Sequence, residues 1–406
     1  MRITKIAVWI DTIFSPETGG GYSYYERLIQ GIDKYVFDKS IEICFVTEVN
    51  YNKTSLKREI IHCDYKPHSS IIERILCHIP SNGNYYKLWK ESQLLKEKDT
   101  RYKDILKKNN VDIILYPKQC LCKIDNFPFI TMNWDIGHLS TYSFPEVIYD
   151  GAFEFRNNFY RNSIYKALMV LCESNAGKEE LIKYTSINED RVRVIPIFPG
   201  SVSEINLPEY KQKSILEHYS LTENRFFYYP AQFWAHKNHY TLVNAFADFL
   251  KLRPHYKLVL SGSDQGNMRY IKRIVSELKL EDYVVFAGFV DSDTVYTLYK
   301  NATAMTMVPM MGPTNMPPLE AMDAGCPVIC SDFPGHREEL GDAAIYIDPI
   351  RKESIINAME CVVNDREKYC KLIEKQRTTT PHTLENALFC LNNNLIEAAK
   401  IRSLWG

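Results

Sequence analysis

Residues 311–330 read MGPTNMPPLEAMDAGCPVIC, in which a Gly/Pro-rich turn, a short helix and an apolar strand follow one another. The helix is expected from about Pro318, and proline loses no hydrogen bond at the first helical position. Glu320 falls in the predicted first turn, where the helix dipole favours an acid. The stretch could be an ordinary loop–helix–strand joint. Its free N–H groups could equally hold an anion, because helix starts carry partial positive charge.

Strands and helices alternate on both sides of this joint. In the second half, strands are predicted over 225–233, 256–263, 283–290, 302–309, 326–332 and 343–349, and helices over 239–252, 267–280 and 293–302. In the first half, strands are predicted over 6–10, 41–48, 111–117, 127–135, 167–174 and 192–198, with helices over 26–36, 87–108, 152–166 and 176–184. This alternation predicts α/β sheets of parallel strands with helices on both faces.

The length of 406 residues suits two such domains. The polar segment 199–212 is the best candidate linker. We predict an amino-terminal Rossmann-like domain over 1–204, a second Rossmann-like domain over 205–385, and a terminal helix over 386–406 that packs back across the linker. Two doubly wound domains would face a cleft at the carboxyl ends of their strands, where ligands of such folds bind.

The composition is that of a globular protein, with 24% charged residues, 45% hydrophobic residues and a formal net charge of -1. Nothing in this balance indicates nucleic-acid binding, and no window reaches the ~20 apolar residues of a membrane helix. The first residues predict a strand and not a signal peptide. The eleven cysteines are scattered, several of them in apolar runs, which favours reduced thiols and a cytoplasmic location. The CLC sequence at 120–122 lacks the second ligand pair of a zinc site.

The segment PPLEAMDAGCPVICSD (317–332) resembles the donor-site segment of glycosyltransferase family 4, retaining enzymes of the GT-B fold. The resemblance covers most of the chain and is strongest over 225–349. It extends to FYYPAQFWAHKNHYTLVNAF (227–246), FAGFVDSDTVYTLYKNA (286–302), GHREELGDAAIYIDP (335–349), GGGYSYYERLIQGI (19–32), NWDIGHLSTYSFPEV (133–147) and VLCESNAGKEEL (170–181).

The resemblance implies a nucleotide-sugar donor, no metal and no other cofactor. Lys237 would stabilise the charge that grows on the leaving diphosphate, and Glu320 would accept hydrogen bonds from the ribose. Asp135 and His138 would complete the catalytic set by handling the sugar or the acceptor. The donor would also contact Gly20, Gly21, Gln232, Gly288, Phe289, Thr314, Asn315, Met316, Pro317, Leu319 and Glu338.

Ordinary structural explanations stay open for several of these residues. Lys237 could be a solvated surface lysine, and His138 a histidine satisfied within the fold. Glu338 could be an acid that merely matches a helix N-terminus. The glycines at 19–21 could form a tight turn between a strand and a helix.

Two positions depart from the family pattern. The family has a pair of glutamates separated by seven residues; the second is Glu320, and Gly312 occupies the place of the first. The family also has an arginine five residues before the phosphate-binding lysine, where this chain has Gln232. We interpret GPTN and QFWAHKNH as a variant donor site, and these two positions bear on which groups touch the donor's sugar and phosphates.

The predicted function is therefore a retaining, metal-independent glycosyltransferase with a glycan or lipid-linked acceptor, in bacterial surface polysaccharide synthesis. Two alternatives stay open. A nucleotide-sugar epimerase can share the architecture, and a catalytically inactive nucleotide-sugar-binding scaffold would explain Gly312 and Gln232.

The region 87–108 has eight Lys/Arg against four Asp/Glu. A basic amphipathic helix can lie on anionic lipid, so peripheral membrane contact is one hypothesis for this region. A solvated helix with ion pairs between successive turns is the other.

Overall fold

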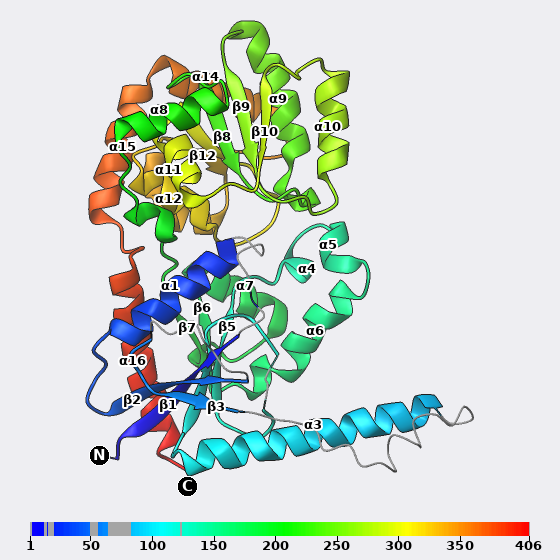
Figure 1. The fold of residues 1–406 in the computed structure, drawn as a ribbon, viewed down its shortest axis with the longest axis vertical. Helices are drawn as coiled ribbons and strands as arrows, with labels where there is room; N and C mark the ends of the chain where they lie inside the picture. The colour runs from blue at the N-terminus through cyan, green and yellow to red at the C-terminus, as the bar shows by residue number, and fades with distance from the viewer. Residues whose placement is uncertain are drawn as a thin grey trace.

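The computed structural model describes residues 2–11, 14, 20–48, 56–63, 83–121 and 124–405, with the side chains of 83–95 excepted. Gly19 and Cys122 lie outside the described residues. Two separate sheets, each entirely parallel, form the centres of two α/β domains, stacked one above the other in Figure 1. The prediction of two doubly wound parallel sheets is confirmed.

The first sheet has seven strands in the order β3-β2-β1-β4-β5-β6-β7. These strands are β1 (Thr4–Ile10), β2 (Ile41–Thr47), β3 (Ile60–His62), β4 (Ile113–Tyr116), β5 (Phe129–Asn133), β6 (Met169–Cys172) and β7 (Val192–Val194). Its central strands β4, β5 and β6 are buried along their whole length. Continuous apolar runs suit this position, because a parallel sheet is covered by helices on both faces.

The second sheet has six strands in the order β10-β9-β8-β11-β12-β13. These are β8 (Phe226–Pro230), β9 (Lys257–Ser261), β10 (Val284–Gly288), β11 (Ala304–Met307), β12 (Val328–Ser331) and β13 (Ala344–Ile347). In the first sheet the strand order reverses between β1 and β4, and in the second between β8 and β11. The loops after two such strands run to opposite faces of the sheet and leave a crevice between them, where open α/β sheets bind ligands.

Helices flank both sheets (Figure 1). In the first domain they are α1 (Gly20–Lys34), α3 (Gly83–Lys108), α4 (Gly137–Ser140), α5 (Pro145–Ile148), α6 (Ala152–Asn162) and α7 (Asn175–Thr185). Beyond it follow α8 (Glu209–His218), α9 (His239–Leu252), α10 (Met268–Glu277), α11 (Ser292–Asn301), α12 (Met316–Asp323), α13 (Pro334–Leu340), α14 (Lys352–Asn364), α15 (Arg366–Thr379) and α16 (Leu384–Arg402). Single turns of 3-10 helix, among them η5 (Ser201–Glu204) and η6 (Ala235–Lys237), complete the connections.

Two local predictions are wrong. Helix α1 begins at Gly20 and not near residue 26, so the glycines that suggested a turn form its first turn. Helix α12 begins at Met316, which moves Glu320 out of the first turn. For both helices packing against the rest of the fold outweighs local propensity. The candidate linker 199–212 contains η5 and the start of α8, and its role as the linker stays a prediction.

The terminal helix α16 contacts α1 and β2 of the first sheet and runs down beside that domain in Figure 1. Just before α16, the His382 ring lies within hydrogen-bond distance of the carbonyls of Ile197 (3.0 Å) and Glu338 (3.2 Å), one from each half of the chain. The domain bounds at 204/205 and 385/386 stay predictions.

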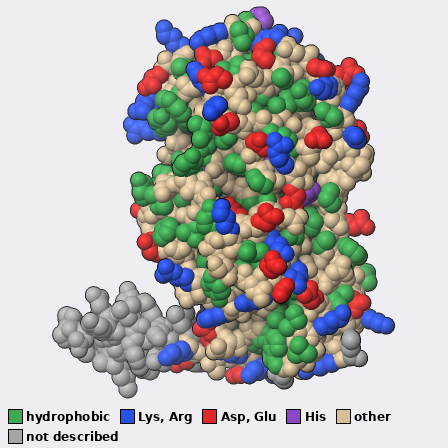
Figure 2. All heavy atoms as spheres, turned by 180° about the vertical axis from the view of Figure 1, so that it is seen from behind, with side chains coloured by type: hydrophobic (Ala, Val, Ile, Leu, Met, Phe, Trp, Pro, Cys, Tyr) green, Lys and Arg blue, Asp and Glu red, His purple; other side chains and the backbone are tan. Residues whose placement is uncertain are grey.

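None of the helices in the described part of the chain has the length and apolar character needed to cross a bilayer. Lys/Arg and Asp/Glu side chains are interspersed over the face shown in Figure 2, without one dominant patch of either sign. Cys44, Cys172, Cys326 and Cys330 are buried thiols, as predicted.

Candidate active site between the two domains

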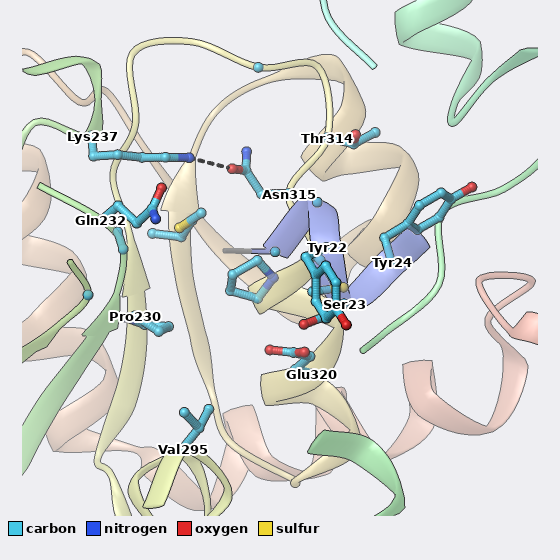
Figure 3. A pocket seen from close by; sticks show the side chains of 18 of the residues that line it. Tyr22, Ser23, Tyr24, Pro230, Gln232, Lys237, Val295, Thr314, Asn315 and Glu320 are labelled. Atoms are coloured by element: carbon cyan, nitrogen blue, oxygen red, sulfur yellow. Dashed lines mark hydrogen bonds between the residues drawn. The ribbon is translucent and has the colours of Figure 1, made fainter. Parts of the chain in front are cut away.

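A pocket of about 590 Å³ lies between the domains, at the carboxyl ends of strands from both sheets. The first domain contributes the start of α1 and the loops after β5 and β6. The second domain contributes the loops after β8, β9, β10 and β11 and the start of α12. Predicted site residues in its wall are Gly20, Gly21, Asp135, Gln232, Lys237, Phe289, Thr314, Asn315, Met316, Pro317 and Glu320. In Figure 3, Tyr22 and Tyr24 of α1 stand on one side of this space and Gln232 and Lys237 on the other.

Lys237 is held by a chain of two polar side chains that ends on a backbone carbonyl. Its Nζ donates to Asn315 Oδ1 at 3.0 Å, the dashed line in Figure 3. The Asn315 Nδ2 lies 2.9 Å from His336 Nε2, and the His336 Nδ1 lies 2.7 Å from the Ser331 carbonyl. A carbonyl only accepts, so Nδ1 carries the ring proton and Nε2 accepts from the amide. Burial lowers the pKa of His336 to about 4, which keeps the ring neutral.

Asn315 is the N-cap residue of α12, but its side chain makes no capping hydrogen bond. Its amide oxygen faces Lys237 instead, and its backbone N–H donates to the buried Glu339 at 3.2 Å. Pro317 and Pro318 carry no N–H and the Asn315 N–H is engaged, so in the first turn of α12 the Met316 N–H and the positive end of the helix dipole lie beside a lysine ammonium. This combination can hold a diphosphate, since helix N-termini and lysine both favour phosphate oxygens.

Burial lowers the pKa of Lys237 to about 8, against the opposing effect of the Asp135 and Glu146 charges. The ammonium has given up much of its hydration without gaining a carboxylate partner at hydrogen-bond distance among the residues that the structure describes. An incoming dianion would supply that partner. The site is electrostatically prepared for an anionic ligand, because a desolvated charge interacts more strongly than a hydrated one.

Glu320 is buried on α12 at the opposite end of this wall. Its Oε2 accepts a hydrogen bond from the Tyr299 hydroxyl at 3.1 Å, and it is also bonded to the backbone of Gly200. A Cβ at Gly200 would lie 2.3 Å from Glu320 Oε1, so a side chain there would displace this carboxyl. Burial raises the pKa of Glu320 to about 7, and the two hydrogen bonds work against that rise.

Asp135 and His138 take different places although they are close in sequence. Asp135 lines the pocket, where it is paired with Arg156 and accepts from the Gly137 N–H at 2.8 Å. His138 is buried behind it, with Nε2 3.1 Å from Asn157 Oδ1 and its ring stacked on Tyr160. The structure does not place His138 in the pocket wall.

Gly288, Leu319 and Glu338 also lie outside the pocket wall. Leu319 is fully buried in the core, and Gly288 ends β10 with φ +71°. Glu338 reaches the first domain: its Oε1 accepts from the backbone N–H of Asn175 at 2.9 Å and its Oε2 from Ala176 at 3.1 Å. It thus satisfies free N–H groups at the start of α7 and joins the two domains.

Several residues of the wall were missed by sequence reasoning. Glu173, directly after β6, is buried and accepts a hydrogen bond from Thr314 Oγ1 at 3.1 Å. Burial raises its pKa to about 8. Gly262 has φ +145°, and a Cβ there would lie 2.4 Å from the Ala231 carbonyl oxygen, so only glycine fits between β8 and β9. The polar type of Glu173 at a strand end was the signal that could have identified it.

His236 ties the lysine-bearing turn to the first domain. Its backbone N–H donates to Glu146 Oε1 at 2.9 Å, and its ring Nδ1 contacts the same carboxylate. Within the described ranges no group of three or more His, Cys, Asp and Glu is arranged to hold a metal ion. Among the described residues of the pocket wall, Lys237 is the side chain that carries a positive charge.

Two parallel Rossmann-like sheets with a ligand pocket between their carboxyl edges define the GT-B fold. The solved structure of HepE from Anabaena, in complex with UDP and glucose, aligns with a TM-score of 0.68 at 15% sequence identity, covering 97% of this chain and 100% of that one. At this identity the likeness shows the fold alone.

Residues 210–379 match the family model described as glycosyl transferases group 1. An uncharacterized glycosyltransferase of Methanocaldococcus jannaschii is 30% identical over 209 residues, 50% of this chain and 53% of that protein. The O-antigen chain mannosyltransferase RfbU of Salmonella typhimurium is 26% identical over 199 residues, 49% of this chain and 52% of the relative. The chain thus spans about half the length of the curated relatives it matches. Together these matches support a glycosyltransferase of the GT-B fold.

Proposed function

We propose that this chain is a retaining, metal-independent glycosyltransferase of family 4, in a variant branch marked by GPTN. It would move a sugar from a nucleotide-sugar donor to a glycan or lipid-linked oligosaccharide, in surface polysaccharide synthesis. One observation carries the proposal: Lys237, the start of α12 and Glu320 converge on one interdomain pocket. All three belong to the segment that matches the glycosyl transferases group 1 model. The names of the O-antigen mannosyltransferases support the polysaccharide acceptor.

The chemistry that this wall suits is a front-face substitution at the anomeric carbon. The bond from that carbon to the diphosphate oxygen breaks, and the acceptor oxygen bonds to the same face of the sugar. A departing phosphate oxygen takes the acceptor's proton. Lys237, the Met316 N–H and the dipole of α12 would stabilise the negative charge on the diphosphate as it grows. Positioning of the two reactants by the two domains would supply much of the rest of the rate.

The direct test is release of nucleoside diphosphate. The protein is incubated with UDP-glucose, UDP-N-acetylglucosamine, GDP-mannose and ADP-glucose, each with and without glycan acceptors, and products are resolved by chromatography. We expect acceptor-dependent release with one donor and retained anomeric configuration in the product. Tight nucleotide binding without release would favour an inactive scaffold, the reading that Gly312 and Gln232 motivate. Conversion of the donor sugar to its epimer would favour the epimerase.

The pH dependence of kcat/KM is a second expected result. The protonated Lys237 is the form that stabilises the diphosphate, and its pKa is lowered to about 8 by burial. The ammonium is therefore present below pH 8 and lost above it. We expect kcat/KM, which reports the free enzyme, to fall about tenfold for each pH unit above that value.

A Lys237→Arg variant is the control for this profile, since arginine keeps its charge to much higher pH. Whatever its absolute rate, the arginine variant should lack the fall above pH 8. An identical fall in both proteins would assign the titration to another group and remove Lys237 from this role.

Contact with anionic lipid through α3 is a further part of the proposal. Lys107 and Lys108 are exposed in the last turn of α3, and Lys103 pairs with Asp99. Each lysine near an anionic surface contributes about 1 kcal/mol. Replacing all three lysines with glutamine should therefore reduce co-sedimentation with phosphatidylserine-containing vesicles by about tenfold or more.

The matched control changes the same charge elsewhere. Lys211, Lys213 and Lys279 are exposed in the second domain, and their replacement with glutamine should leave co-sedimentation unchanged. Equal binding by both triple variants and the unaltered protein would remove the membrane hypothesis and leave α3 as a solvated helix.

A further inference from the structure

The loop that carries GPTN is held from both domains. The Thr141 Oγ1 donates to the Met310 carbonyl at 2.9 Å, and Met311 packs on Gly137 so closely that a Cβ there would lie 2.3 Å from its Sδ. From the other side, a Cβ at Gly335 would lie 1.5 Å from the Pro313 carbonyl oxygen. The path of this loop is therefore fixed by contacts at several successive residues.

This path excludes an ordinary side chain at position 312. Gly312 has φ +109°, a conformation that L-residues with a Cβ rarely adopt. A glutamate there would be strained, although a Cβ would make only ordinary contacts, at 3.5 Å from the Thr314 carbonyl oxygen and 3.7 Å from Asn315 Nδ2. This chain therefore has no carboxyl at the position where the family pattern has its first glutamate.

A carboxyl from the other domain stands beside this loop. Glu173 lines the same pocket and is 8% exposed, and its Oε2 accepts from Thr314 Oγ1, two residues after Gly312. Its raised pKa means that the carboxyl carries a proton at neutral pH and can both donate and accept a hydrogen bond. Nearby, the buried Tyr24 hydroxyl has no hydrogen-bond partner among the described residues and lies in the same wall.

We propose that Glu173, oriented by Thr314, provides from the amino-terminal domain a carboxyl that contacts the donor sugar, in a pocket where position 312 offers none. It would bond a hydroxyl of the donor sugar and so determine which sugar is accepted. This proposal rests on the proposed transferase function. The alternative role for Glu173 is structural: its hydrogen bond with Thr314 would only hold the two domains together. The two roles predict different binding data.

The experiment separates the sugar from the nucleotide. Isothermal titration calorimetry measures UDP, GDP, UDP-glucose and GDP-mannose against the unaltered protein, Glu173→Ala and Thr314→Val. For the nucleotide that binds, we expect the free diphosphate to keep its affinity within about twofold in both variants, because neither loses a nucleotide contact. The nucleotide sugar should lose about tenfold in Glu173→Ala, and less in Thr314→Val, which leaves the carboxyl in place but unoriented.

The control is Glu179→Ala, which removes an exposed acid of α7 and should change neither affinity. Unchanged nucleotide-sugar binding in a folded Glu173→Ala protein overturns the proposal. An equal loss of affinity for the nucleoside diphosphate and for the nucleotide sugar also overturns it, because loss of a purely structural contact would weaken the binding of both. If the alanine variant does not fold, Thr314→Val decides by the same comparison. Failure of the unaltered protein to bind any of these four probes, and likewise ADP, ADP-glucose and UDP-N-acetylglucosamine, would overturn the proposed function itself.

Discussion

Replacing Lys237 with alanine is expected to lower kcat by about 10²–10³-fold, the usual cost of removing one group that stabilises charge in the transition state. The Lys237 ammonium has one hydrogen-bond partner among the described residues, Asn315, and the lysine lines the pocket between the domains. Burial already disfavours its charged form, as the lowered pKa shows. Its removal therefore relieves a desolvation cost, and the melting temperature should not fall.

The measurement is steady-state kinetics with the donor identified by the product assay, together with a thermal melt. Lys279→Ala is the matched control, since this exposed lysine of the same domain lies outside the pocket wall. It should behave like the unaltered protein in both assays. Normal kinetics in a folded Lys237→Ala protein would contradict the assignment of Lys237 to the diphosphate site.

Replacing Glu320 with alanine is the second large effect. The variant should bind the nucleoside diphosphate about 10–100-fold more weakly, because two ribose hydroxyls lose their acceptor. It should also unfold more easily, by about 1–3 kcal/mol, since the buried Tyr299 hydroxyl loses its partner. Both losses come from one side chain, so they must be separated by a second variant.

Tyr299→Phe provides that separation. It removes the same internal hydrogen bond at 3.1 Å but keeps the carboxylate in the pocket. We expect its loss of affinity, measured by calorimetry, to be clearly smaller than that of Glu320→Ala. Comparable losses in the two variants would mean that Glu320 acts on the fold of the wall and not on the nucleotide.

The architecture could be predicted from sequence because its strands are marked locally. Helix α9 begins and ends where the apolar periodicity placed it, and the predicted strands that form β1, β2 and β8 overlap the observed ones. The start of α1 could not be predicted, because glycines at 20 and 21 are poor helix formers whose position is fixed by packing. A Cβ on Gly21 would lie 3.2 Å from the Trp134 ring.

The site residues could be predicted where they lie in one recognisable segment. They could not be predicted where their role depends on a contact between the two domains. Lys237, Asn315 and Glu320 come from recognisable segments and do line one pocket. Glu173 escaped attention because its significance depends on Thr314, which lies 141 positions away. Glu338 belongs to a predicted donor segment, yet its carboxylate faces the start of α7. Side-chain direction at a domain boundary depends on tertiary contacts that local patterns do not encode.

The central claim is that the interdomain pocket binds a nucleotide sugar with its diphosphate on Lys237 and its ribose on Glu320. A crystal structure of the protein soaked with the nucleoside diphosphate that binds in calorimetry tests it most directly. The account predicts phosphate oxygens within hydrogen-bond distance of Lys237 Nζ and of the Met316 N–H at the start of α12, with ribose hydroxyls on the Glu320 carboxylate. A nucleotide bound elsewhere, or one in this pocket that leaves both side chains untouched, would contradict it.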